Sequence, residues 1–568
     1  MAAKRLWVAG LLWLLVGCKG SDGVGPPLPP CTSGTPLALA IGAYQSVDPG
    51  PVSGCIVFPA SASATEYLLV PQAATGTPND MQAFQLVGSA LAPSAMASRV
   101  AAPGPAPAAA GPAERFHLFL RQAERSRAYP VPPQPQRPAG LQPAVQGAAQ
   151  ASPPPRRPFT PADSGMINSF RVCVNLVCDT LKTVDAALTK IGQHIALYID
   201  TAAPRPGLSQ TDLDGLRDVF DNRLYAIDHA AFGTESDIDS NAVVIVLMTN
   251  RVNQLVDSLE CRASIVAGYF FGADIDPFWR TSYNNAEIFY AMVPDQANTL
   301  KSCARPVSLV KRLVPVTFVH EFQHMISFNQ HVLVRKGDSE ILWLNEALSH
   351  YAEERGGRSF LPTDTTTFCD YVVGDLYNSG QYLTAPASHF LVDTSGIGAL
   401  EERGAYWLFA RYVIDQFAAD TSLAAADAFT SKLDQTALTG VANVSQQTGN
   451  TPFATLVTRW VLANYVSDLP AFTAPGGLQY KKWAFRTDYA TLRTRCGSAN
   501  IPGSFPLVPD SGDGSAVNLS GVLRAGSGEY FRARQAAGAA QFGLLFSNTT
   551  GGALRGSLVP RLNVIRIQ

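Results

Sequence analysis

The chain has 568 residues, of which 46% are hydrophobic and 15% are charged. Its 43 basic and 45 acidic residues leave a formal net charge of −2. Because the chain is nearly neutral and has no basic stripe with interleaved aromatic residues, it is not expected to bind nucleic acid. Its length predicts several domains.

The first 18 residues, MAAKRLWVAGLLWLLVGC, have the order of an export signal. Lys4 and Arg5 precede an apolar run from Leu6 to Val16 that is too short to span a bilayer. The closing LVGC resembles a bacterial lipobox, which implies cleavage before Cys18 and lipid attachment to its thiol. An ordinary secretory signal with a stray cysteine is the alternative. We therefore expect a lipid-anchored protein of the bacterial cell envelope, on the outer membrane, in the periplasm or at the surface, and otherwise a secreted protein.

Two changes of composition follow the signal. Residues 19–92 contain short apolar runs such as GCIVFPA and TEYLLVPQ between Gly, Pro and Ser, which predicts a small β-rich domain. Residues 93–165 are dominated by Ala and Pro, which predicts an extended linker. One island in this linker, AERFHLFLRQAERSRAY, has helical spacing. It either docks on a folded domain or acts as an inhibitory pro-segment, and docking is the favoured interpretation.

Cysteine usage agrees with export. Of nine cysteines, eight remain if Cys18 carries lipid, and an even number in an exported chain predicts disulfides. Proximity in the sequence favours three pairs, Cys31 with Cys55, Cys173 with Cys178, and Cys261 with Cys303. A second metal site is the alternative for some of these residues, although no C-x-x-C occurs.

Residues 166–475 alternate between strand and helix patterns. The runs IALYID, VVIVLMTN, IVAGYFF and AEIFYAMV predict strands, and DLDGLRDVFDNRLYAIDHAAF predicts a helix between the first two. The later runs YWLFARYVIDQF and FATLVTRWVLANYV predict helices. We expect a sheet backed by helices, followed by a helical half, with a cleft between the two lobes.

The segment VTFVHEFQHMI carries two histidines four residues apart. His320 and His324 lie on one helix face and can offer imidazole nitrogens to one ion, while Glu321 points beside them. The neighbouring apolar residues predict a buried helix with Pro315 at its first position. This geometry suits zinc held by two histidines, with the glutamate moving the proton of a water at the metal.

A third ligand is expected from the next helix, WLNEALSHYAEE. Glu346, His350 and Glu353 follow one another at i, i+4 and i+7 on one face of this helix. The preceding Gly-Asp-Ser, residues 337–339, predicts a turn that ends one helix and caps the next. Two antiparallel helices would then place Glu346 against the histidine pair.

These two motifs resemble the gluzincin metallopeptidases, which have a thermolysin-like active site. The closer similarity is to the hyicolysin family, which has a similar HEFQHMI segment followed by a W-L-N-E-x-L-S helix. The resemblance covers roughly residues 165–470. It implies an α+β gluzincin-type metallopeptidase core, with one catalytic zinc on His320, His324 and Glu346 and with Glu321 as the catalytic base.

One position departs from this resemblance. Thermolysin-like enzymes have an aspartate that orients a ligand histidine at the position where this chain has His350. Glu353, one turn further on, is the candidate to take over that role. Both residues are therefore candidates for the shell around the zinc ligands.

The remaining polar candidates have weaker signals. A donor for the developing oxyanion is sought among His389, Tyr351 and Tyr406, with Arg403 behind them. His331 lies near the predicted end of the zinc helix, where a structural role at the helix terminus is favoured.

Three further histidines and two acidic turns complete the candidates. No metal-ligand spacing occurs at His117, His194 or His229. The acidic turns SDIDS and PDSGDG are candidates for structural calcium, and turn or cap roles are favoured because neither matches a complete calcium loop.

Residues 476–568 return to strand patterns such as GEYFRAR, QFGLLFSN and RLNVIRIQ, which predict an accessory β-sandwich. The whole chain is thus expected to be a multi-domain protein, with an α+β gluzincin-type metallopeptidase core flanked by small all-β domains.

The function expected from these features is that of an exported, zinc-dependent endopeptidase acting on protein or peptide substrates. Gluzincin aminopeptidases resemble one another in a G-[AG]-M-E-N strand, which this chain lacks, since Glu287 stands among different neighbours. A zinc aminopeptidase and a non-catalytic surface binding protein on a peptidase fold are the alternatives.

Overall fold

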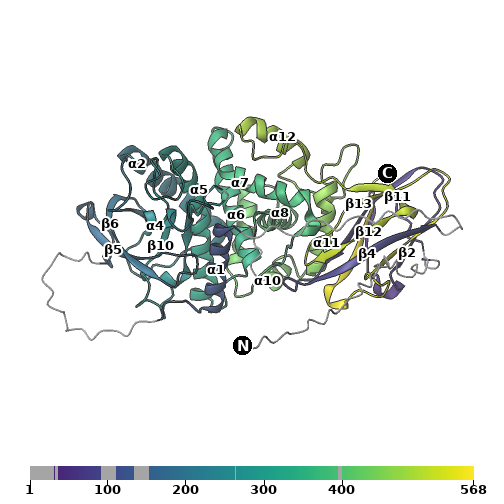
Figure 1. Ribbon diagram of the computed structural model, residues 1–568, viewed down its shortest axis with the longest axis horizontal. Coiled ribbons are helices and arrows are strands. Elements are labelled where there is room, and N and C mark those ends of the chain that lie inside the picture. Colours follow the sequence, from purple (N-terminus) through teal and green to yellow (C-terminus); the bar gives the residue numbers. More distant parts are fainter. Residues whose placement is uncertain (1–30, 32–35, 91–110, 133–152, 263, 395–398) are drawn as a thin grey trace, which may run out of the picture.

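A computed structural model describes residues 31, 36–90, 111–132, 153–262, 264–394 and 399–568. The predicted export signal and Cys18 lie outside the described residues. The molecule is elongated, with a mixed sheet at one end, helices in the middle and a β-sandwich at the other end (Figure 1). Within the described part of the chain, none of the helices combines the length and hydropathy that a membrane span needs.

The first layer is a six-stranded sheet in the order β5-β6-β7-β8-β10-β9. Its strands β7, β8 and β10 are parallel, and β9 pairs antiparallel with β10 at the edge of the sheet. All four predicted strands of this region are confirmed, because runs of Val, Ile, Leu and aromatic residues satisfy a sheet buried on both faces. The strands are β5 (Ile167–Cys173), β6 (Leu181–Ile191), β7 (Ile195–Asp200), β8 (Val244–Met248), β9 (Gly268–Phe270) and β10 (Ile288–Ala291).

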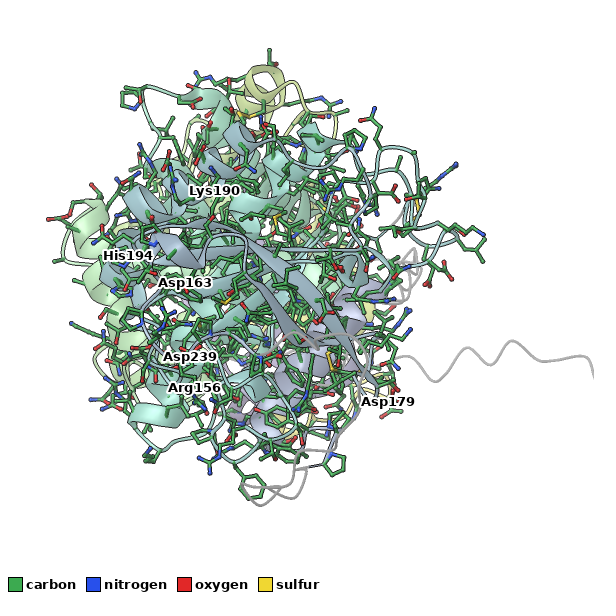
Figure 2. All side chains as sticks on the ribbon, turned by 90° about the vertical axis from the view of Figure 1, so that its left-hand side faces the viewer. Arg156, Asp163, Asp179, Lys190, His194 and Asp239 are labelled. Carbon is green, nitrogen blue, oxygen red and sulfur yellow. A yellow bond between two sulfur atoms is a disulfide. The ribbon has the colours of Figure 1, made fainter. Side chains whose placement is uncertain are left out.

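The predicted helix between β7 and β8 is confirmed as one continuous crossover. It consists of α2 (Gln210–Val219), the π-helical turn η3 (Phe220–Leu224) and α3 (Tyr225–Phe232), and it contacts both the sheet and α5. Ser209 caps its start by accepting from the backbone N–H of Asp212. At the outer end of this lobe, charged side chains such as Lys190 and Asp179 lie at the surface (Figure 2).

Helices fill the middle of the molecule. They are α5 (Val307–Phe328) with its π-helical extension η5 (Asn329–Val334), α6 (Leu342–Arg358), α7 (Thr365–Thr384), α8 (Leu400–Phe417), α9 (Leu423–Asp434), α10 (Gly440–Gln447), α11 (Phe453–Val466) and α12 (Phe485–Cys496). A short helix α4 (Asn250–Asn253) follows β8. The 3-10 turns are η1 (Gly50–Val52), η2 (Pro161–Asp163), η4 (Gly272–Asp274), η6 (Pro386–Ser388), η7 (Gly476–Leu478), η8 (Gly514–Ala516) and η9 (Gly556–Leu558).

Two predicted helix starts are wrong. Helix α5 begins at Val307, so Pro315 lies in its interior, where the missing N–H removes one helical hydrogen bond without ending the helix. Helix α6 begins after Ile341, which makes no side-chain cap, so Ser339 does not cap it. In both cases tertiary burial outweighs the local signal, because α5 and α6 pack against each other along faces that are buried.

A buried charge cluster holds α6 in place from the side away from the histidines. Glu354 is fully buried and accepts from Arg358 Nε and from the indole N–H groups of Trp407 and Trp483. Burial alone would raise the pKa of Glu354, but Arg358 and Arg411 keep it below its usual value. Removing one member of such a buried pair typically costs about 3–5 kcal/mol, so this cluster fixes the position of α6.

The two β-rich ends of the chain form one β-sandwich and not the two separate domains predicted from the sequence. Its sheets have the orders β1-β15-β3-β13-β11 and β12-β4-β14-β2. The strands are β1 (Tyr44–Val47), β2 (Cys55–Phe58), β3 (Thr65–Ala73), β4 (Met81–Ala90), β11 (Asp510–Asp513), β12 (Asn518–Arg524), β13 (Phe531–Gln535), β14 (Phe542–Ser547) and β15 (Pro560–Arg566). Strands β1–β4 alone would leave unpaired edges, and pairing them with β11–β15 satisfies the backbone groups at these edges.

The start of the C-terminal β region also differs from the predicted residue 476. Residues 485–496 form α12, which packs on α7 and is joined to it by the disulfide Cys369–Cys496. The three predicted disulfides, Cys31–Cys55, Cys173–Cys178 and Cys261–Cys303, are confirmed. The sandwich packs on α11, where Tyr530 donates to the carbonyl of Val461.

The helical island of the predicted linker is helix α1 (Pro112–Ser126). It lies beside α6 in the middle of the molecule (Figure 1). Most of its side chains are buried, including the polar residues Glu114, His117, Arg121 and Glu124. The prediction that this island docks on a folded domain is confirmed, and the surface that it covers is part of the candidate site.

Candidate metal centre

Helices α5 and α6 bring three predicted ligands together. The Nε2 atoms of His320 and His324 lie 3.2 Å apart. From α6, the carboxylate of Glu346 places Oε2 3.7 Å from His320 Nε2 and Oε1 3.6 Å from His324 Nε2. All three side chains are buried, with exposed fractions of 6%, 1% and 1%.

This donor set fits a zinc ion. Both carboxylate oxygens of Glu346 are buried and have no hydrogen-bond partner among the described residues. Arg403 Nη1 lies 3.5 Å from Oε2, but a buried carboxylate without hydrogen bonds that faces two imidazole nitrogens is costly unless a cation also lies between them. Ligands about 2.0–2.1 Å from a tetrahedral zinc ion lie about 3.4 Å from one another, which is close to the separations found here.

Two residues of α6 orient the imidazole rings of His320 and His324. His320 Nδ1 lies 2.6 Å from Glu353 Oε1, and His324 Nδ1 lies 2.5 Å from Asn345 Oδ1. With the protons on Nδ1, each ring donates to its oxygen partner and turns its Nε2 lone pair toward Glu346. Glu353 therefore lies where it can orient His320, the role expected for it from the sequence. Asn345 was not singled out, although it stands directly before Glu346 in the motif.

His350 supports Glu353. Its Nδ1 lies 3.3 Å from Glu353 Oε1 and 3.0 Å from Asp375 Oδ1 on α7. Burial alone would lower the pKa of His350, but the two carboxylates raise it, and the His350 charge in turn holds the pKa of Glu353 below its usual value. Asp375 has no signal in the sequence, because α7 carries no motif and reaches the site only through packing.

Glu321 lies beside the three ligands and is anchored by the sheet. Its Oε2 accepts a hydrogen bond of 2.7 Å from the backbone N–H of Phe270 in β9. Only 2% of Glu321 is exposed, and burial raises the pKa of its carboxyl against the opposing charges of His320 and Arg121. A glutamate with a raised pKa that is held next to metal ligands can both accept and release a proton.

The candidates for an oxyanion donor lie at different places. Among these candidates, Arg403 forms an ion pair with the candidate zinc ligand Glu346, since its Nη1 lies 3.5 Å from Glu346 Oε2. The hydroxyl of Tyr406 is buried and has no hydrogen-bond partner in the described chain. Burial, followed by the charges of Asp393 and Glu402, raises its pKa. His389 pairs with Glu402 at 3.1 Å, and Tyr351 lies under the guanidinium of Arg411.

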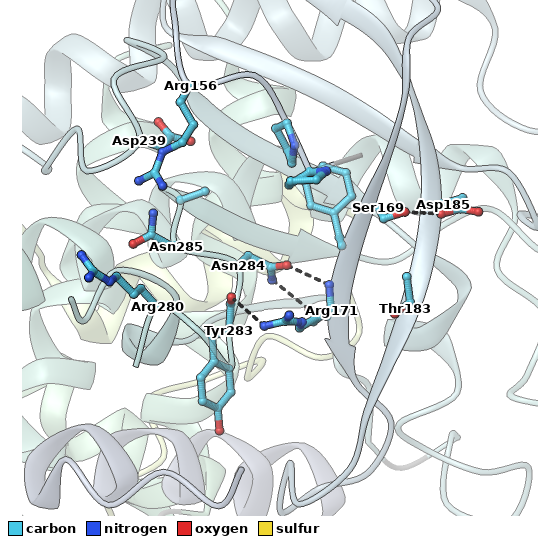
Figure 3. Close-up of a pocket in the computed structure, with 14 residues that line it drawn as sticks. Arg156, Ser169, Arg171, Thr183, Asp185, Asp239, Arg280, Tyr283, Asn284 and Asn285 are labelled. Carbon is cyan, nitrogen blue, oxygen red and sulfur yellow. Dashed lines mark hydrogen bonds between the residues drawn. The ribbon is translucent and has the colours of Figure 1, made fainter. Parts of the chain in front are cut away.

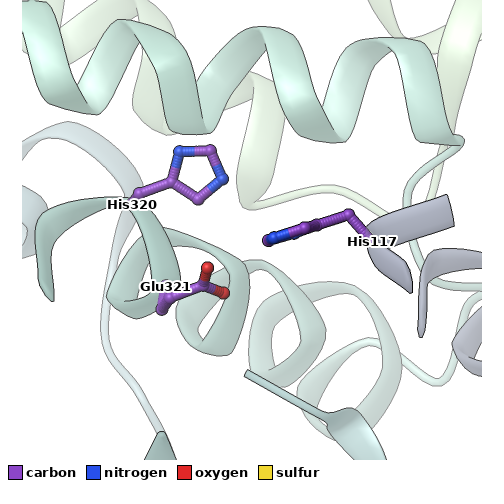
Figure 4. Close-up of side chains that lie close together, drawn as sticks. All are labelled: His117, His320 and Glu321. Carbon is purple, nitrogen blue, oxygen red and sulfur yellow. The ribbon is translucent and has the colours of Figure 1, made fainter. Parts of the chain in front are cut away.

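A further residue at the site, His117, has no signal in the sequence. His117 on α1 has donor atoms within 4.8 Å of those of His320 and Glu321, and it points toward both from a separate helix (Figure 4). Because it lies about 200 positions upstream of the motif, no spacing rule connects it with the site. His331, by contrast, is fully buried between Glu340 and Asp434, as a structural histidine would be.

Two other polar regions lie apart from the His320 cluster. A cavity of about 670 Å³ is lined by β5, β6, residues 153–156 and the loop 280–286. Asn284 in this loop bonds to the backbone of Arg171 (Figure 3). Next to the cavity, Asp237, Asp239 and Glu287 bring carboxylate oxygens within 4.8 Å of one another. Burial, followed by the Glu287 charge, raises the pKa of Asp239 to about 7. Calcium at this turn stays a prediction.

Comparisons with known proteins support a peptidase relationship over part of the chain. No protein-family model matches it. The neutral metalloprotease ShpI of Staphylococcus hyicus is 32% identical to it over 135 residues. This similarity covers 24% of the chain and 28% of the relative, so the chain matches less than a third of the length of that protein.

The arrangement around His320 predicts a graded loss of zinc affinity. Replacing Glu353 with alanine should reduce the affinity about 10- to 100-fold, as is typical for a residue that orients a ligand, because His320 would lose the acceptor for its Nδ1 proton. Competition with a chelator measures this affinity. The surface variant Asp214→Asn should leave it unchanged, and an equal affinity for Glu353→Ala and the parent chain would contradict the assigned role.

Proposed function

We propose that this chain is an exported zinc-dependent endopeptidase with a gluzincin-type core. The observation that carries the proposal is the convergence of His320, His324 and Glu346 on one point, with Glu321 held beside them by β9. The partial similarity to a neutral metalloprotease supports the same class of activity. A surface binding protein that does not cut would have no need for a glutamate anchored in this position.

In the proposed mechanism, His320, His324 and Glu346 hold the ion. When bound, zinc supplies Lewis acidity that makes a water acidic near neutral pH and polarises the scissile carbonyl. Glu321 accepts the proton of the attacking water and passes it to the leaving amine. The backbone N–H of Phe270 keeps the carboxylate of Glu321 oriented throughout both transfers. Arg403, next to Glu346, is the best placed candidate to stabilise negative charge that develops on the substrate.

Cleavage inside polypeptides is favoured over removal of amino-terminal residues. Glu287, the candidate to bind a substrate ammonium group, is 1% exposed, and its Oε1 accepts from Ser236 Oγ and from the backbone N–H of Ile238. Glu287 therefore stabilises the loop that contains Ser236 and Ile238. An ammonium group would lose its hydration in the cleft without this carboxylate as a partner.

Replacement of Glu321 by glutamine tests the catalytic base. The variant keeps the size of the side chain and an oxygen for the Phe270 N–H, but it cannot accept the proton of water. Peptide hydrolysis should fall by about 10²-fold or more while the zinc content stays near one per chain. Casein cleavage and metal analysis measure the two quantities. The variant Glu529→Gln in the β-sandwich should change neither, and a loss of zinc in Glu321→Gln would refute the assignment.

A comparison of two substrates tests the cleavage mode. An internally quenched peptide with a blocked amino terminus should be hydrolysed, whereas free amino-acid anilides should be cleaved slowly because no carboxylate is available for their ammonium group. Fluorescence and absorbance give the two values of kcat/KM. Efficient anilide cleavage with the blocked peptide left intact would make the chain an aminopeptidase.

The envelope location rests on residues 1–18 and is tested separately. If Cys18 carries the lipid, then Cys18→Ser should move the protein from the detergent phase to the aqueous phase or block its processing, because a hydroxyl cannot form the thioether. Phase partitioning of cell extracts measures the shift. Unchanged partitioning would show that another feature anchors the protein.

A further inference from the structure

Helix α1 presents a polar stripe to the interior of the protein. His117, Arg121 and Glu124 follow one another at i, i+4 and i+7, so they lie on one face of the helix. Their exposed fractions are 8%, 2% and 1%. A helix that only covered a hydrophobic surface would bury apolar residues on that face. The buried polar stripe therefore needs specific partners beneath it.

Two of these partners are backbone groups, one in the edge strand β9 and one in the turn η4 just after it. Arg121 Nη2 donates to the carbonyl of Phe270 at 2.8 Å, and Glu124 Oε1 accepts from the N–H of Gly272 at 2.8 Å. Strand β9 is the last strand of its sheet, so the backbone groups of Phe270 that point away from β10 have no strand partner. An extended peptide added to this edge would compete with Arg121 for the Phe270 carbonyl and with Glu124 for the Gly272 N–H, whereas the Phe270 N–H is held by Glu321.

Arg121 and Glu124 also pair with each other. Their Nη2 and Oε1 atoms lie 3.0 Å apart, and both side chains are almost completely buried. A buried ion pair of this kind is stable only while both partners and the backbone groups remain in place. The pair therefore fixes α1 against Phe270, whose N–H orients Glu321, and against Gly272 two residues further on.

His117 enters the space that the reaction needs. Its donor atoms lie within 4.8 Å of those of His320 and Glu321, and its ring centroid is 6.2 Å from that of His320 (Figure 4). Its Nδ1 is buried and has no hydrogen-bond partner among the described residues. A substrate carbonyl has to lie between the metal ligands and Glu321, so His117 and a substrate cannot occupy this space together.

Contacts at both ends of α1 connect it with two parts of the molecule. At its start, Ser264 Oγ accepts from the backbone N–H of Ala113 at 3.0 Å. After its end, Arg127 forms two hydrogen bonds of 2.7 and 2.6 Å with Asp276. Arg125 reaches the other side, where it donates to the carbonyl of Ser339. Helix α1 thus bridges the sheet lobe and the helical lobe across the metal centre.

We propose that α1 is a built-in inhibitor that occupies the substrate's place, with His117 facing the ligand His320 and the base Glu321, and with Arg121 and Glu124 taking the Phe270 carbonyl and the Gly272 N–H just after β9. This inference rests on the proposed peptidase function and adds its regulation. Activation then requires displacement of α1, since its polar stripe and an extended substrate compete for the same atoms.

The test uses the full chain and three variants of α1. His117→Ala removes the side chain next to the metal ligands, and Arg121→Ala removes the bond to the Phe270 carbonyl. Arg115→Ala is the matched control, because Arg115 is half exposed on the same helix and its salt bridge to Glu260 lies at the surface. Near-ultraviolet circular dichroism and zinc content establish that each variant is folded and loaded. If Arg121→Ala does not fold, His117→Ala alone carries the test.

Two measurements report on the site. The first is the affinity for a small hydroxamate that chelates the metal, which does not depend on turnover. If α1 covers the site for at least about 90% of the time, uncovering it should raise the apparent affinity at least about tenfold. The second is hydrolysis of the blocked, internally quenched peptide, whose kcat/KM should rise by a similar factor. Arg115→Ala should match the parent chain in both measurements.

The outcomes separate the two proposals. Equal hydroxamate affinity in the parent chain, His117→Ala and Arg121→Ala would overturn the inhibitory role of α1, whatever the activity. A rise in affinity without hydrolysis in any variant would support the covering role and refute the peptidase function.

Discussion

The burial of charged and polar side chains around His320 and His324 is the constraint on which the arrangement of the elements around the candidate metal centre depends. Each buried polar group needs a partner, and the partners come from separate elements. Glu353 and Asn345 on α6 accept from the two imidazoles, Asp375 on α7 supports His350, and the backbone of β9 holds Glu321. Satisfying these groups at the same time leaves little freedom for the relative positions of the four elements.

Helix α6 illustrates how neighbouring residues divide this work. Glu353 faces the histidines, whereas Glu354 points to another side of the helix and binds Arg358, Trp407 and Trp483. A helix rotates by about 100° per residue, so consecutive glutamates reach different surroundings. One carboxylate orients a candidate zinc ligand, and the next one fixes the helix that carries it.

The free edge of β9 connects the centre with the rest of the chain. In a sheet, an edge strand offers unpaired carbonyl and N–H groups, which either bind another strand or have to be covered. Here Arg121 and Glu124 cover them with side-chain atoms. The same edge that would hold an extended substrate is thereby occupied by a segment of the chain itself, and the adjacent His117 faces the metal ligands. Under the proposed function, control of access and substrate binding would depend on overlapping backbone atoms.

Local patterns in the sequence determined the elements and the core of the centre. The runs of Val, Ile and Leu predicted the strands, and the spacing of His320, His324 and Glu346 predicted which side chains converge, because these signals depend on residues that are close in the chain. Only the tertiary structure decided that the two β-rich ends form one sandwich, that Asp375 supports His350, and that His117 reaches the site. These contacts join residues far apart in the sequence, and the free energy that selects them comes from burial and from hydrogen bonds that exist only after the elements have packed.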